Sequence, residues 1–137
     1  MKKIVGVGLL AGLAMTLVGV VINVVMNIVL PELNEAYKTS GLFRPWSDPR
    51  MMMFFLIPFF TGIILAWVWT KVKEVVKGGT PTAKSLNYGL IYWLTTLPGM
   101  LITYSSFNVS LAMVMSWTVA NLFEGVVACL LIAKLMK

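Results

Sequence analysis

Residues 4–31 read IVGVGLLAGLAMTLVGVVINVVMNIVLP, and no charged residue occurs among them. A helix of roughly 20 apolar residues is long enough to cross the roughly 30 Å hydrocarbon core of a bilayer. This stretch therefore predicts a transmembrane helix near residues 4–30, and the fold follows from what lies beyond it.

Three more apolar stretches follow the first one. The uncharged segments are 51–70, 85–123 and 125–133, and a polar turn at 104–110 interrupts the second. With the first helix, they predict four helices. We expect a single all-α domain over residues 1–137, an integral membrane four-helix bundle. Its helices should lie near 4–30, 50–77, 82–104 and 111–136, with an extracellular segment at 31–49 and a cytoplasmic loop at 78–81.

The composition excludes several kinds of chemistry. The chain is 59% hydrophobic and 12% charged, with a mean hydropathy of +0.89, whereas about a quarter of a soluble domain is charged. It contains no histidine, so no imidazole can bind a metal or activate a nucleophile. Its single cysteine, Cys129, cannot form an internal disulfide or a cysteine-based zinc site. We expect no metal and no cofactor.

Helix starts are marked by short local signals. Asp48-Pro49 and Thr80-Pro81 each combine a capping side chain with a proline at the first helical position. Ser110 can cap the last helix in the same way. These signals predict helices that begin just after positions 48, 80 and 110.

Lysine and arginine predict the orientation. With four crossings, both termini and the segment 71–84 share one side of the membrane. That side has eight of the 11 cations: Lys2, Lys3, Lys71, Lys73, Lys77, Lys84, Lys134 and Lys137. Because positive residues gather on the cytoplasmic side, we expect a multi-pass protein of the cell membrane with both termini in the cytoplasm. The net charge of +6 therefore indicates orientation, and nucleic acid is not an expected partner.

The two halves of the chain resemble each other. FTGIILAWVWTK at 60–71 aligns with FEGVVACLLIAK at 123–134 at an offset of 63, and TLVG at 16–19 aligns with TLPG at 96–99 at an offset of 80. These matches have two interpretations. Apolar helices can resemble each other by chance, or the chain consists of two helical hairpins of the same orientation, related by an axis along the membrane normal.

One face of the first helix has only small and polar residues. They are Gly8, Gly12, Thr16, Gly19, Asn23 and Asn27, which recur every three or four positions. Gly8 and Gly12 also form a GxxxG motif, which lets two helices approach closely. We interpret this face as a helix-packing seam inside the bundle or between protomers; the alternative is that it lines a polar pathway.

Glu124 is the one carboxylate predicted to lie within the hydrocarbon. An ionised carboxylate is costly there, so Glu124 should face the interior of the bundle and either stay protonated or find a partner. Asn121 lies one turn away, and four threonines should lie at a similar depth: Thr16, Thr61, Thr95 and Thr96. These residues form a candidate intramembrane polar site. Its two interpretations are hydrogen-bonded contact between helices and a site for a proton, ion or substrate.

The segment 31–50 is the largest one predicted outside the membrane. Its first part, 31–37, can form a short amphipathic turn with Leu33, Ala36 and Tyr37 towards lipid. The remainder is rich in proline, arginine and aromatic residues. Arg44, Trp46 and Arg50 are therefore the candidate contacts for a partner or ligand, and pairing of the arginines with nearby carboxylates is the alternative.

Three functional classes remain open. The first is a non-catalytic membrane module that acts as a homo-oligomer or as the accessory subunit of another membrane protein. The second is a small transporter or channel for protons, cations or a small solute that uses Glu124. The third is a membrane enzyme, which lacks an evident nucleophile or metal partner for Glu124. We expect the first class, a protein that is not an enzyme and whose surroundings are the lipid bilayer.

Overall fold

The computed structural model describes residues 1–136, and these form helices joined by turns with no strand among them. The elements in chain order are α1 (Lys2–Val29), α2 (Glu32–Thr39), η1 (Pro49–Met51), α3 (Met52–Val72), α4 (Pro81–Ser106) and α5 (Leu111–Leu135). The all-α prediction is confirmed. Lys137, counted above among the cytoplasmic lysines, lies outside the described residues.

Three of the helices are apolar enough to span a membrane. They are α1, the continuous helical stretch Pro49–Val72 and α5, whose best windows have mean hydropathies of 2.4, 2.2 and 1.7. The 26 residues of α4 also give sufficient length, but threonine, tyrosine, tryptophan and proline are interspersed among its apolar residues. The fourth crossing therefore stays a prediction.

The predicted helix starts are confirmed. The Asp48 carboxylate accepts a hydrogen bond from the Arg50 backbone N–H at 2.9 Å and opens η1. The Thr80 hydroxyl accepts from the Ala83 N–H at 3.1 Å, and the Ser110 hydroxyl accepts from the Met113 N–H at 3.2 Å. In each case a side-chain oxygen satisfies a backbone N–H that the first helical turn leaves free.

The end of α3 differs from the prediction. We expected this helix to continue to residue 77, but it ends at Val72, and the loop that follows covers 73–80. The chain turns here because Val76 packs into the core. The Lys84 ammonium also donates to the Lys73 carbonyl oxygen at 3.2 Å, which fixes the turn against the start of α4.

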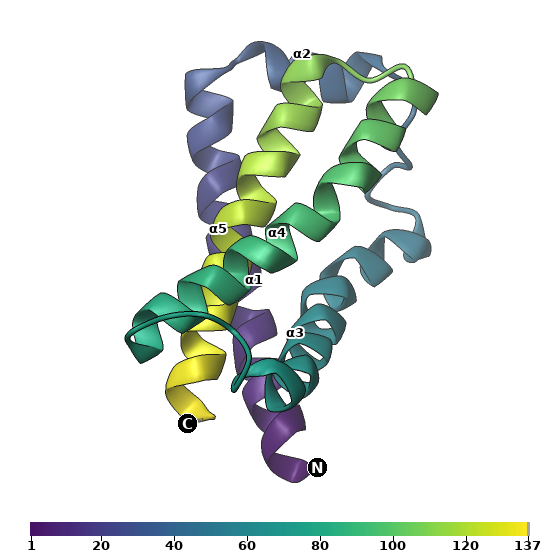
Figure 1. Ribbon diagram of the computed structural model, residues 1–137. Helices are drawn as coiled ribbons and strands as arrows, with labels where there is room; N and C mark the ends of the chain where they lie inside the picture. The colour runs from purple at the N-terminus through teal and green to yellow at the C-terminus, as the bar shows by residue number, and fades with distance from the viewer. Residues whose placement is uncertain (137) are drawn as a thin grey trace.

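The long helices pack in the order α3, α1, α5, α4 (Figure 1). Helix α3 also contacts α5 near the C-terminus, where the Trp69 indole N–H donates to the Met136 carbonyl oxygen at 3.4 Å. Helix α4 reaches α3 through Tyr88, whose hydroxyl donates to the Leu65 carbonyl oxygen at 2.9 Å and whose ring centroid lies 5.2 Å from that of the Trp69 ring. Otherwise α3 and α4 lie apart, so the described residues form an open row and a closed four-helix bundle is not confirmed.

Small residues bring α1 and α3 into backbone contact. A Cβ added at Gly8 would lie 2.5 Å from the Ile63 Cα, and one added at Gly12 would lie 2.5 Å from the Phe59 Cα. Gly62 of α3 lies directly opposite these two glycines. In lipid, such close approach is a main source of helix association. The GxxxG motif thus serves a contact inside the chain.

A second glycine contact joins α4 and α5. A Cβ at Gly89 would lie 2.9 Å from the Val126 Cα, and one at Gly125 would lie 2.5 Å from the Tyr92 ring. Each buried residue of α3 has a buried counterpart 63 positions later in α5. The pairs are Gly62 and Gly125, Leu65 and Ala128, Ala66 and Cys129, and Trp69 and Ile132. The α1–α5 contact has no matching α4–α3 backbone contact, so the two hairpins are not arranged symmetrically.

We expect Gly8→Ala to lower the free energy of unfolding by about 1–3 kcal/mol, because the new methyl group meets a backbone atom that cannot rotate away. Gly6→Ala is the matched control in the same helix, since a Cβ there has nothing within 4 Å. It should be neutral or stabilising by up to about 1 kcal/mol. Unfolding by SDS titration, followed by helical circular dichroism, measures both variants. Equal stability of the two would contradict the backbone contact.

Candidate functional site

Glu124 lies where α5 crosses α1. A Cβ added at Gly19 of α1 would lie 2.5 Å from the Glu124 Oε1, so the carboxyl group occupies the space left by the missing side chain. The Glu124 side chain is half-buried. Across residues 1–136 the structure gives its carboxyl group no hydrogen-bond partner and no cation. Glycine at position 19 therefore accommodates the only acid on α5 without pairing it.

The predicted hydrogen-bonded group around Glu124 does not form. The hydroxyl groups of Thr16, Thr95 and Thr96 donate to carbonyl oxygens of their own helices, at 3.0, 2.6 and 2.7 Å. A threonine in a helix reaches the carbonyl three or four residues earlier more easily than a group on another helix. Thr61 and Asn121 are half-buried, and no side-chain hydrogen bond joins either of them to Glu124.

The surface beside Glu124 is an apolar groove between α1 and α5. Leu17, Val18, Val21 and Ile22 line it from α1, and Phe123 and Val127 line it from α5. Each lining side chain is a hydrocarbon, so this groove offers no polar group that could bind an ion or a polar solute. Its chemistry matches a lipid acyl chain.

The small and polar face of α1 meets different surroundings along its length. Gly8 and Gly12 pack on α3, whereas Gly19 faces Glu124 of α5. Further along, the Asn27 amide donates to the Asn23 side-chain oxygen at 2.9 Å, on an exposed part of the helix. The face thus serves two helix contacts and ends in a self-paired amide, and it lines no continuous polar path among the described residues.

The turn at 31–37 faces the protein instead of lipid, contrary to our expectation. It forms α2, in which Leu33 is fully buried and Ala36 and Tyr37 are half-buried. The Tyr37 hydroxyl accepts a hydrogen bond from the Trp117 indole N–H of α5, and the Phe43 ring packs on both aromatic rings. Sequence periodicity placed these residues on one face, but it could not show that α5 provides the apolar partner.

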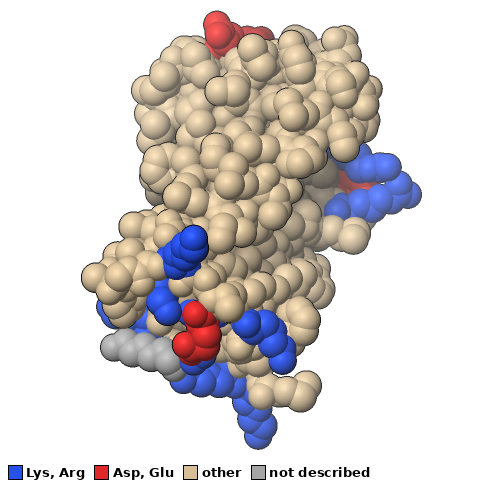
Figure 2. All heavy atoms as spheres, viewed as in Figure 1, with Lys and Arg blue, Asp and Glu red and all other residues tan. Residues whose placement is uncertain are grey.

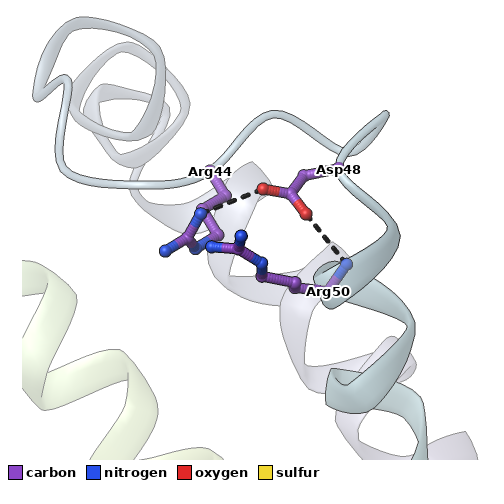
Figure 3. A network of polar contacts seen from close by, with 3 residues as sticks. All are labelled: Arg44, Asp48 and Arg50. Carbon is purple, nitrogen blue, oxygen red and sulfur yellow. Dashed lines mark hydrogen bonds and ion pairs between the residues drawn. The ribbon is translucent and has the colours of Figure 1, made fainter.

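Arg44, Asp48 and Arg50 form a cluster just before α3 (Figure 3). The Arg44 Nη1 lies 3.0 Å from the Asp48 Oδ2, and the other oxygen of Asp48 caps η1. Trp46 is exposed beside them, with its ring 6.1 Å from the rings of both Phe54 and Phe55. The predicted pairing of Arg44 with a carboxylate is therefore present.

Charge is confined to three zones of the visible surface. Figure 2 shows most of the visible cations, with acidic atoms among them, near the end that holds both termini. Further acidic atoms lie at the opposite end, and a smaller group of cations surrounds an acidic patch at one side. An uncharged surface separates these zones. Such a surface fits a lipid environment between two polar layers.

Besides the Tyr37–Trp117 contact, sequence reasoning missed three other polar contacts that join elements. They are Tyr88 with Leu65, Trp69 with Met136, and Trp93, whose indole N–H donates to the Thr118 carbonyl oxygen at 2.9 Å. Tryptophan and tyrosine are common at membrane interfaces, so composition alone does not reveal contacts of this kind. A buried tyrosine or tryptophan needs a hydrogen-bond partner for its polar atom. This requirement could have predicted that these side chains contact neighbouring helices.

We compared the chain with protein-family models, curated proteins and solved structures. None of them matches it. The site is therefore interpreted from the residues and contacts described above.

Proposed function

We propose that the chain crosses the membrane four times, with both termini in the cytoplasm, and acts as a non-catalytic membrane module. In this proposal it works through contacts with a second copy or with another membrane protein. The alternatives are transport of protons, cations or a small solute, and catalysis within the membrane. The observations below support the module over both.

The packing of α4 supports the fourth crossing. This helix runs against α5, which is itself apolar enough to span a membrane. Its exposed side chains include Leu90, Leu94 and Leu101, the last of which is 69% exposed. Contact of such side chains with lipid avoids the cost of their hydration, about 25 cal/mol for each Å² of apolar surface. The one charged residue of α4, Lys84, lies in its first turn, as the cytoplasmic boundary requires.

The residues around Glu124 give the main support for a non-catalytic role. A transport site needs polar groups that converge on a hydrated path, and an enzyme site needs a nucleophile or electrophile near its acid. Glu124 instead lies against Gly19 beside an all-hydrocarbon groove. The neighbouring threonine hydroxyls are bonded to their own helices. One observation favours transport as the second candidate: the carboxyl group has no fixed partner, so its proton is not held by another side chain.

The outer segment supplies the surface for partner contact. The small-residue seam is used by the α1–α3 contact, so it is not available to a second chain. By contrast, α2 and the residues after it expose charged and aromatic side chains. The Tyr37–Trp117 hydrogen bond joins α2 to α5, so this surface is held in a fixed position on the helices. We therefore assign the partner contacts to residues 31–50.

Glu124→Gln tests the absence of transport. We expect the variant to fold as the wild type does and to leave the pH response of sealed liposomes unchanged, because Glu124 does not relay protons. A fluorescent pH dye trapped in the liposomes measures proton entry after an external acid pulse. Glu74→Gln, at an exposed position in the 73–80 loop, is the control. Proton entry with the wild type that Glu124→Gln alone abolishes would contradict the proposal.

A photo-crosslinking amino acid at Asn34 tests the assigned contact surface. Asn34 is exposed on α2, and we expect irradiation of intact cells to join it to a second copy or to another membrane protein. Leu101, exposed on α4, is the matched control and should react with lipid alone. Immunoblotting shows the size of each product. Protein adducts at Leu101 without any at Asn34 would assign the contact to the helices and overturn this part of the proposal.

A further inference from the structure

The arginine cluster contains one more positive charge than it can pair internally. Asp48 uses one carboxylate oxygen for the Arg44 guanidinium and the other for the Arg50 backbone N–H. The Arg50 guanidinium has no carboxylate partner within the described part of the chain. Figure 3 shows the Arg50 guanidinium directed towards the Arg44 guanidinium, so the two cations lie next to each other. Asp48 is the only carboxylate in this cluster of three residues. An added anion would offset the repulsion between the two cations.

The cluster lies where the apolar surface of α3 begins. Met52 and Phe54 follow it at once, and both are more than half exposed. The exposed Trp46 ring packs against Phe54, so a wide aromatic surface adjoins the two guanidinium groups. Tryptophan and arginine at such a boundary are typical of the level of lipid headgroups. The anion nearest to this boundary in a membrane is a phosphate that carries acyl chains.

We infer that Arg44 and Arg50 bind the phosphate group of an anionic phospholipid in the outer leaflet. The inference rests on the proposed four-crossing topology, which places this segment outside. Each planar guanidinium can donate two parallel N–H bonds to phosphate oxygens, which a lysine ammonium cannot do. One phosphodiester charge balances the single excess positive charge of the cluster. The acyl chains of the lipid lie along the exposed start of α3, and Trp46 contacts its glycerol region.

Native mass spectrometry of the full chain, purified in detergent with equal amounts of phosphatidylglycerol and phosphatidylcholine, tests this assignment. We expect the wild type to retain phosphatidylglycerol preferentially. Arg44→Gln/Arg50→Gln should reduce that preference by about fivefold for each arginine removed. Lys71→Gln/Lys73→Gln is the matched control, because it removes two cations at the other end of α3 and should retain most of the preference.

Asp48→Asn gives a change in the opposite direction. The asparagine oxygen still caps η1, but the competing negative charge is gone, so phosphatidylglycerol retention should rise. Added inorganic phosphate should not displace the lipid, because it lacks acyl chains. If millimolar phosphate does displace it, the cluster is a free-anion site and the lipid assignment is overturned.

Equal retention by the wild type and Arg44→Gln/Arg50→Gln would also overturn the inference. If that double variant loses its helical circular dichroism, Arg50→Gln alone replaces it, since the Arg50 guanidinium makes no hydrogen bond within residues 1–136. Labelling of Arg44→Cys by an impermeant reagent separates the two proposals. If the cysteine is labelled from outside and the wild type shows no lipid preference, this inference alone is refuted. If the cysteine is labelled only from the cytoplasmic side, the proposed topology is refuted.

Discussion

The close approach of α1 and α3 at Gly8, Gly12 and Gly62 is the contact on which the rest of the structure depends. Lipid does not drive apolar side chains together as water does, so helices in a bilayer associate where small residues allow many short contacts. This contact fixes α3 on one side of α1 and leaves α5 to pack elsewhere along it. Gly19 then lies opposite Glu124, and α4 joins the assembly through the second glycine contact, at Gly89 and Gly125.

Local sequence signals predicted the helices well, because their causes are local. Asp48, Thr80 and Ser110 each cap a helix through a backbone group two or three residues away. The end of α3 was not predictable in this way, since it depends on Val76 entering a core built from distant helices. Similarly, the apolar face of α2 was evident in the sequence, but its partner on α5 was not.

The candidate site was predicted only as a set of residues at similar depth. Depth along a helix does not show which way a side chain is bonded, and the hydroxyl groups of Thr16 and Thr96 turn to carbonyl oxygens of their own helices. Glu124 is consequently less connected than we expected. Its position beside a hydrocarbon groove, and the use of the glycine seam within the chain, together direct attention to the outer segment. There the aromatic contact with α5 and the Arg44–Asp48 pair hold a charged surface at the start of α3.

Helix α4 is the most polar of the four long helices, yet we propose that it crosses the membrane beside α5. Single cysteines at Gly79, exposed just before this helix, and at Ser106, its exposed last residue, test the crossing. The native Cys129 is buried and should not react. Labelling with an impermeant maleimide should modify Ser106→Cys in intact cells and Gly79→Cys only after the membrane is opened. Equal labelling of both cysteines in intact cells, or of neither, would show that α4 does not cross.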